Sequence, residues 1–334
     1  MTIARKLLVD ENVTPWYHCI SRCVRRAFLC GEGFEHRKDW IEERLKTLVE
    51  VTAIDCGGFA IMDNHLHLLL RLDSEASKGW SAEDVARRWS VLFPPKEEKG
   101  QGDEAIKLWV AQRAQDAEWI EKARGRLASL SWFMKCLKEP IARRANREDE
   151  CTGAFWEGRF RSVAVLDEES LLATCAYIDL NPVAAGIVKT PEDSSHTSLA
   201  ARLVKIGEKE NGQVAHQSRD DSDPAWLMPV EDRRERGGCC GLLAGFTLEH
   251  YLRLVDWTSR LVRQGKSSVD AEVASIFERL GFDVEHWQAT MLSLFGEKRL
   301  VGCFFGRPAS LTEAARQLDR RWVKQRGTRA VVAG

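Results

Sequence analysis

The sequence predicts an α+β protein on the strength of three observations. The chain has 334 residues, 44% hydrophobic and 30% charged, which is typical of a globular protein that buries a core. Segments in which polar and apolar residues alternate, as in half-buried strands, follow segments with apolar residues at helical spacing. These two patterns take turns over residues 13–188, which indicates an antiparallel sheet with helices packed on it.

Three strands and one helix are predicted in the first part of this region. Residues 16–23 alternate as a strand, and residues 34–52 carry apolar side chains at helical spacing. Residues 53–62 and 65–72 are strands joined by Asp63-Asn64, which are residues typical of a turn. The two strands therefore form a predicted hairpin.

A helix, a hairpin and a second helix are predicted after residue 126. The helix at 127–147 contains Pro140, and the hairpin at 153–166 turns at Glu157-Gly158. The last helix spans 167–180; Asp167 caps its start, and Asn181-Pro182 ends it.

The remaining segments suggest an insertion and a C-terminal extension. Helices at 78–93 and 104–126, joined by a polar linker at 94–103, form a helical insertion over residues 74–126. The predicted organisation is a core domain at 13–188, a linker at 189–244 and a helical region at 245–334. Within that last region, helices are expected at 247–265, 268–280, 284–295 and 312–325.

Composition excludes several classes of protein. No apolar run approaches the ~18 residues of a membrane span, and the first residues lack the apolar block of a signal peptide. The ten cysteines include no Cys-x-x-Cys pair, so neither a disulfide framework nor a four-cysteine zinc site is expected. We therefore expect a cytoplasmic protein that does not bind membranes.

The net charge of −1 hides one basic segment. Residues 122–147 carry eight Lys or Arg side chains and a single carboxylate, Glu139. Such a segment is either a solvated helix face or a surface that contacts phosphates, and the charge pattern alone leaves both open.

Two histidines fall on one face of a predicted strand. His65 and His67 are two residues apart, so they point the same way, while Leu66, Leu68 and Leu70 point to the opposite face. Two imidazoles side by side on a strand can bind one divalent metal ion. The alternative is a pair of hydrogen-bonded structural histidines.

Tyr177 and Asn181 form a second pair. They are four residues apart on the predicted helix at 167–180 and therefore share a face. A phenol beside an amide oxygen suits a nucleophile next to a metal ligand. The alternative is that Tyr177 packs in the core and Asn181 only ends the helix.

Four blocks of sequence, in order, resemble the single-tyrosine HUH transposases, and most closely the REP-associated tyrosine transposases. They include Asn64-His65-Leu66-His67, the block at 155–162 (FWEGRFRS) and the block at 177–186 (YIDLNPVAAG). The resemblance covers residues 13–188 and excludes 74–126. Two departures are Asp63, where the family usually has Pro, and Asp179, where a His is common.

The resemblance implies a ferredoxin-like (RRM-like) antiparallel sheet and an endonuclease that acts on single-stranded or hairpin DNA. It makes His65 and His67 metal ligands, Asn181 the third ligand and Tyr177 the nucleophile. A donor set of two nitrogens and one oxygen favours Mg²⁺ or Mn²⁺. Attack by the tyrosine then gives a 5′-phosphotyrosine and a free 3′-OH, so that strands can be rejoined in DNA transposition.

Further side chains are candidates for DNA contact, and the resemblance leaves alternatives open. Trp156 either stacks an unpaired base or packs in the core. The alternatives to a transposase are a catalytically inactive DNA-binding protein and a metal-dependent hydrolase, and the protein is either a monomer or a dimer. The candidate DNA-binding residues are Arg22, Arg25, Arg26, Lys135, Lys138, Arg143, Arg144, Trp156, Arg159 and Arg161.

Overall fold

The structure is a computed structural model that describes residues 9–95, 102–210, 224–234, 240–264, 269, 271–296 and 302–324. It divides into two compact units. The first, here called the sheet unit, consists of Met1–Arg22, Cys56–Leu70 and Arg159–Gly334. The second, the helical unit, consists of Cys23–Asp55 and Arg71–Gly158.

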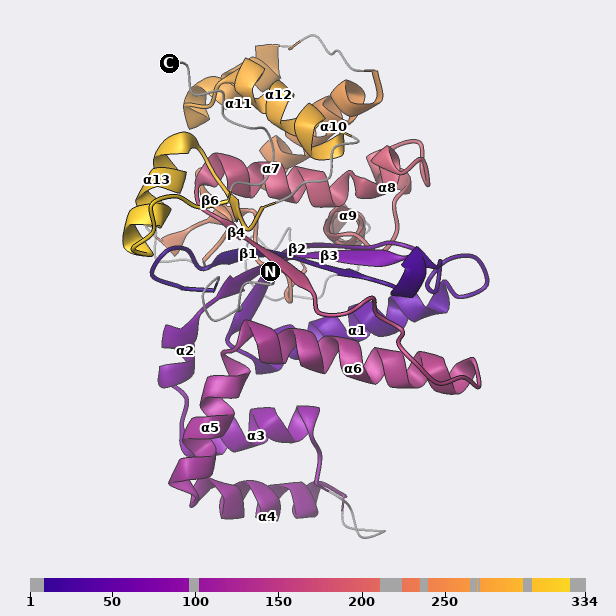
Figure 1. Ribbon diagram of the computed structural model, residues 1–334, viewed down its shortest axis with the longest axis vertical. Coiled ribbons are helices and arrows are strands. Elements are labelled where there is room, and N and C mark those ends of the chain that lie inside the picture. Colours follow the sequence, from indigo (N-terminus) through magenta and orange to yellow (C-terminus); the bar gives the residue numbers. More distant parts are fainter. Residues whose placement is uncertain are drawn as a thin grey trace. The chain divides into compact units, whose positions relative to one another are not determined.

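A five-stranded sheet in the order β2-β3-β1-β4-β7 is the centre of the sheet unit. Figure 1 labels four of its strands, β1 to β4. β4 runs antiparallel to β1 and parallel to β7, so the sheet is mixed and not purely antiparallel as expected. The parallel strand was missed because it is only two residues long and comes from the C-terminal region. The strands are β1 (Trp16–Arg22), β2 (Ile54–Ile61), β3 (His65–Leu72), β4 (Arg161–Val165) and β7 (Phe304–Phe305).

The predicted hairpin at 153–166 is wrong. Only its second arm is a strand, β4, and that strand pairs with β1 and β7. The first arm pairs elsewhere: Trp156 forms an isolated bridge with Cys23, and the N–H of Val24 donates to the carbonyl of Phe155 at 2.9 Å. A distant segment therefore takes the hydrogen bonds that a hairpin would use.

Helix α7 (Glu168–Asp179) is buried on almost every side. Asp167 caps it as predicted, because its carboxylate accepts from the N–H of Ser170 at 2.9 Å. One hydrophobic cluster joins α7 to β4 and to α10 (Leu248–Gln264), and α12 (Val284–Phe295) also packs on it. The short helix α8 (Asn181–Ala184) follows directly (Figure 1).

The C-terminal residues share the core of the sheet unit. Helix α9 (Ser198–Glu210) lies in the predicted linker, where mixed charges had hidden its apolar face; residues 211–223 and 235–239 of that linker lie outside the described residues. The predicted helices appear as α10, α12 and α11 (Ala271–Leu280), and the last, α13, spans Pro308–Gln317 instead of 312–325. A two-stranded parallel pair, β5 (Glu231–Asp232) and β6 (Leu243–Ala244), completes the unit.

The helical unit holds the insertion. Asp116 splits the predicted helix at 104–126, because its side chain accepts from the N–H of Trp119 and starts a new helix. Ser81 likewise divides the helix predicted at 78–93 through a capping box. The elements are η2 (Val24–Arg26), α1 (His36–Val51), α2 (Ser74–Lys78), α3 (Ala82–Leu92), α4 (Gly102–Ala114), α5 (Ala117–Leu127) and α6 (Leu130–Glu148).

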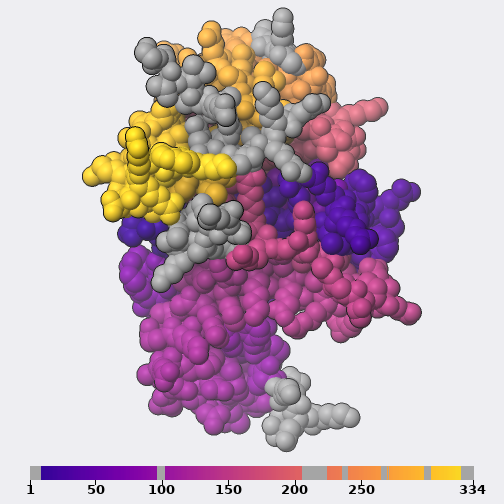
Figure 2. Space-filling view, viewed as in Figure 1, coloured from indigo at the N-terminus to yellow at the C-terminus, as the bar shows by residue number. Residues whose placement is uncertain are grey.

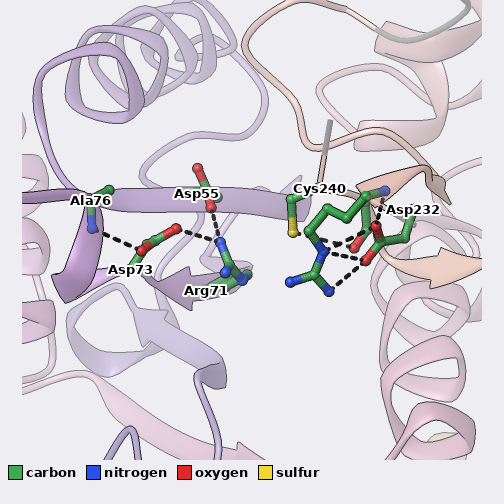
Figure 3. A network of polar contacts seen from close by, with 8 residues as sticks. Asp55, Arg71, Asp73, Ala76, Asp232 and Cys240 are labelled. Atoms are coloured by element: carbon green, nitrogen blue, oxygen red, sulfur yellow. Dashed lines mark hydrogen bonds and ion pairs between the residues drawn. The ribbon is translucent and has the colours of Figure 1, made fainter. Parts of the chain in front are cut away.

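An arginine joins two strand ends to the start of the insertion within the helical unit. Arg71 on β3 donates to Asp55 on β2 at 2.8 Å and to Asp73 at 3.0 Å (Figure 3). Asp73 in turn caps α2 by accepting from the N–H of Ala76 at 3.1 Å. Burial raises the pKa of Asp55, while the Arg71 guanidinium opposes that rise. The residues that the structure describes include no helix long and apolar enough to cross a membrane.

Candidate active site

Three imidazoles lie together on adjacent strands of the sheet unit. His18 on β1 and His67 on β3 are buried, and His18 Nε2 lies 2.8 Å from His67 Nδ1. The ring of His65 is half-buried, and its centroid lies 4.9 Å from that of His67. The structure therefore brings His65 and His67 together, and it adds a third histidine from a neighbouring strand.

The phenol of Tyr177 faces this cluster from α7. Its ring centroid lies 5.5 Å from that of His67 and 5.8 Å from that of His18, both in edge-on geometry. On the side of the C-terminal helices, Phe295 packs against the same ring, with centroids 4.9 Å apart. Tyr177 is half-buried, so the phenol is held by neighbours and still accessible.

The other two tyrosines of the chain occupy packing positions. The Tyr17 hydroxyl donates to the Asp10 carbonyl at 3.0 Å, and the Tyr251 hydroxyl donates to the Asp179 carboxylate. Both rings are buried, and burial raises the pKa of each phenol. Tyr251 belongs to the hydrophobic core of the sheet unit. Of the three tyrosines, only Tyr177 lies beside the histidines.

Asn181 is tied to Tyr177 through the backbone. Its Nδ2 donates to the Tyr177 carbonyl at 2.6 Å, and the side chain is only 9% exposed. This hydrogen bond lies at the end of α7, which agrees with the alternative that Asn181 has a structural role there. Because Nδ2 is the donor in this bond, Oδ1 is the atom that a metal ion would use.

The donor chemistry of these residues fits a divalent ion that takes its other ligands from water and phosphate. His65 Nδ1 lies 2.6 Å from Asn64 Oδ1, and His67 Nδ1 lies against His18. Ligating histidines are typically held in this way through the nitrogen that does not bind metal. The described ranges contain no group of three or more His, Cys, Asp or Glu arranged to hold a metal ion.

Asp179, two residues after the nucleophile candidate, belongs to a separate buried network. Its carboxylate accepts from the Ser198 hydroxyl at 2.6 Å, from the Leu199 N–H at 2.9 Å and from the Tyr251 hydroxyl. Burial raises its pKa, and the charge of buried Arg202 opposes the rise. Where the resemblance leads one to expect a histidine, this chain therefore has a carboxyl that anchors α9 and α10 to α7.

Among the predicted basic residues of the sheet unit, Arg161 is partly buried. Its guanidinium interacts electrostatically with Tyr177 and Arg22 and donates to the Gly302 carbonyl at 2.8 Å. Burial lowers the pKa of Arg161, but arginine remains charged at neutral pH. Arg22 and Arg159 are exposed.

The other predicted DNA contacts belong to the helical unit. Arg25 and Arg26 are exposed and have left-handed backbone angles, with φ of 53° and 56°. On α6, Lys135 lies over the Trp132 ring, Lys138 over Trp156 and Arg144 over Trp40, while Arg143 pairs with Glu139. Trp156 is 8% exposed and its Nε1 donates to the Lys138 carbonyl at 3.0 Å, which is the packing alternative and leaves little ring surface for a base.

Sequence reasoning missed His18 and Phe295. His18 lies in the predicted strand at 16–23, so a buried position was possible for it. Nothing in the sequence shows that β1 lies beside β3, and the contact with His67 could therefore not be predicted. Phe295 lies more than one hundred residues after Tyr177 and ends a helix whose apolar positions look like ordinary core. Both contacts depend on the tertiary structure.

The chain was compared with protein-family models, curated protein sequences and solved structures. No protein-family model and no curated protein sequence matches the chain. A solved structure described as the REP-associated tyrosine transposase bound to a REP hairpin is similar with a TM-score of 0.34 and 13% identity. The similarity covers 64% of this chain and 91% of that one. Likeness of this degree does not establish a family, and the function proposed below depends on the site itself.

Proposed function

We propose that this protein is a transposase-like endonuclease that cleaves single-stranded DNA with Tyr177 and can rejoin the strands. The observation that carries the proposal is the half-buried Tyr177 ring set edge-on against the hydrogen-bonded pair His18–His67, with His65 next to it. The resemblance of the sequence blocks around His65 and Tyr177 supports DNA as the substrate.

The reaction is a transesterification at phosphorus. The Tyr177 oxygen forms a bond to phosphorus as the bond from phosphorus to the 3′ oxygen breaks. The phenol proton passes to solvent, and the leaving oxygen takes up a proton to become a 3′-OH. Attack by a 3′-OH on the phosphotyrosine reverses these changes and restores the phenol, so the cycle consumes no nucleotide.

The residues around Tyr177 perform distinct tasks in this proposal. His67 and Phe295 hold the phenol ring from two sides, which limits its rotamers before attack. The fixed charge of Arg161 favours both the anionic phosphate and a developing phenolate. His65, His67 and Asn181 would hold Mg²⁺ or Mn²⁺, which neutralises phosphate charge when bound.

The strand order also bears on the proposed family. The sequence β1-α1-β2-β3-α6-β4 with the order β2-β3-β1-β4 is compatible with the βαββαβ pattern of ferredoxin-like folds. β7 and the C-terminal helices would then be additions to that core. We propose this relation as part of the same hypothesis.

The test is capture of the covalent intermediate. The protein is incubated with Mn²⁺ and single-stranded hairpin oligonucleotides labelled at the 3′ end, and denaturing gels are read for a labelled protein band. We expect a band that vanishes in Tyr177→Phe, and mass spectrometry should place the DNA on Tyr177. Tyr17→Phe is the matched control, since it removes the same oxygen from a packed ring.

Other outcomes identify the alternative functions. Cleavage that persists in Tyr177→Phe without any adduct would indicate a metal-dependent hydrolase. Binding of the hairpins without cleavage by the unmodified chain would indicate an inactive DNA-binding protein. Either result would overturn the proposed mechanism.

A further inference from the structure

A row of aromatic rings runs across four helices of the helical unit. Trp109 on α4 contacts Trp119 on α5, with ring centroids 5.6 Å apart, and Trp119 contacts Trp89 on α3 at 5.7 Å. Trp89 stacks on Trp132 of α6 at 6.0 Å and 21°, and Phe93 lies 4.9 Å from Trp89. These five residues, here called the aromatic row, form one continuous set of contacts.

The aromatic row is not the core of the insertion. The four indoles are only half-buried, and Phe93 is 40% exposed. The buried apolar side chains of α3, α4 and α5 are instead aliphatic: Val85, Ala86, Leu92, Val110, Ile120, Ala123 and Leu127. The helices therefore already have a core, and the rings add a partly open surface to it. Figure 2 shows the atoms of this part of the chain, coloured purple to magenta, in close packing.

Three cations lie against these rings. Arg126 lies 4.5 Å from the Trp132 centroid and 5.8 Å from that of Trp89, and Lys135 lies 4.7 Å from Trp132. Arg113 lies 5.3 Å from Trp119 and 5.7 Å from Trp109. Basic groups thus accompany the aromatic row along its length.

Two of these cations have long ion pairs. Arg113 Nη1 lies 3.9 Å from Asp116 Oδ2, and Lys135 Nζ lies 4.0 Å from Glu139 Oε2. Arg126 forms no ion pair with any residue in the described part of the chain. Its guanidinium is held by two indoles and retains its hydrogen-bond capacity for an external anion.

We propose that the aromatic row with Arg113, Arg126 and Lys135 binds single-stranded nucleic acid. Unpaired bases would stack on the rings while the cations contact phosphates, the combination by which proteins bind single strands without reading sequence. A duplex is a poor ligand because its bases are already stacked on each other. All residues of this site lie between positions 89 and 135, and none of them takes part in the reaction proposed for Tyr177. The binding site can therefore be tested independently of the proposed function.

Binding is measured by fluorescence anisotropy on the full chain carrying Tyr177→Phe, which prevents cleavage from confusing the signal. The probes are a labelled thymidine homopolymer, which forms no hairpin, the matching uridine homopolymer, and a duplex of equal length. The test variants are Arg126→Gln and Trp119→Leu. The controls are Arg87→Gln on α3 and Lys107→Gln on α4, which remove exposed charges paired with Asp84 and Glu104.

We expect Trp119→Leu to weaken homopolymer binding by at least about fivefold, the lower end of the range for losing one stacked base. Arg126→Gln should weaken binding as well and reduce the salt slope by about 0.7, as for one lost phosphate contact on a single strand. The control variants should bind the homopolymers with an affinity within about twofold of the parent chain. The thymidine and uridine homopolymers should differ in affinity only if the site contacts the 2′-OH of the sugar.

Unchanged affinity in Arg126→Gln and Trp119→Leu, equal losses in the controls, or duplex binding as tight as single-strand binding would overturn the proposal. Circular dichroism checks that Trp119→Leu is folded. If it is not, Phe93→Ala takes its place, because the Phe93 ring is exposed enough to remove without emptying the core.

Discussion

His18 and His67 share a hydrogen bond of 2.8 Å between Nε2 of the first and Nδ1 of the second. The two residues come from neighbouring strands and are both buried. For His67 to offer Nε2 to a metal ion, its Nδ1 must carry the proton and donate to His18. In the proposed mechanism, His18 would therefore be a positioning residue that fixes both the ring orientation and the tautomer of His67.

Replacing His18 tests this role. His18→Leu should raise the Mn²⁺ concentration for half-maximal cleavage about 10- to 100-fold, the usual effect of losing such a partner. His18→Gln should restore much of the affinity, since its amide oxygen can accept the same bond. A metal titration that is unchanged in His18→Leu would show that the pair is structural only.

Removal of both proposed ligands should abolish cleavage and leave the protein folded. In His65→Ala/His67→Ala, the buried side chains of Leu66, Leu68 and Leu70 still carry the packing of β3. Cleavage by the unmodified chain should require Mg²⁺ or Mn²⁺ and stop on addition of a chelator. Full activity of the double variant, measured under single-turnover conditions, would contradict the metal assignment.

Arg161 should matter for the rate of cleavage more than for binding. Arg161→Gln removes a fixed charge that acts on Tyr177, and we expect single-turnover cleavage to fall about 10- to 100-fold with hairpin affinity within about fivefold. Arg159→Gln is the matched control, because Arg159 is exposed and close in sequence. Equal effects of the two substitutions would assign Arg161 to general attraction of DNA.

Asp179 should make stability depend on pH. Because burial raises its pKa, the folded state holds a proton that the unfolded state releases. The contribution of this carboxyl to the free energy of unfolding therefore falls as pH rises from about 4 through the raised pKa. Asp179→Asn should flatten this dependence, which urea denaturation at about pH 5 and about pH 8 would measure.

The same position separates hydrogen bonding from charge. An asparagine can accept from Ser198 and Leu199 with Oδ1 and donate to the Tyr251 oxygen with Nδ2, so we expect stability near pH 7 within about 1 kcal/mol of the unmodified chain. Asp179→Ala leaves those donors without a buried acceptor and should cost about 2–4 kcal/mol. A pH slope retained in Asp179→Asn would show that another group titrates.

The sequence determined those features that depend on neighbours along the chain. Alternation placed β3 with its leucines buried, helical spacing gave α7 and α12, and Asp167 fixed the start of α7. The adjacency of His65 with His67 followed from the strand period. Asn181 begins α8 and does not lie on α7, and its side chain contacts the backbone carbonyl of Tyr177. The sequence did not determine every element end, because Asp116 and Ser81 each begin a new helix within a predicted one.

Only the tertiary structure decided which distant segments meet. The His18–His67 bond, the parallel pairing of β7 with β4, the contact of Phe295 with Tyr177 and the Asp179–Tyr251 bond all join residues far apart in sequence. Such contacts depend on strand order and on which apolar face covers which, and they leave no periodic trace in the sequence. The periodicity of a segment determines which way each of its side chains points. The partner that a side chain contacts is determined by how all the elements pack to bury the core.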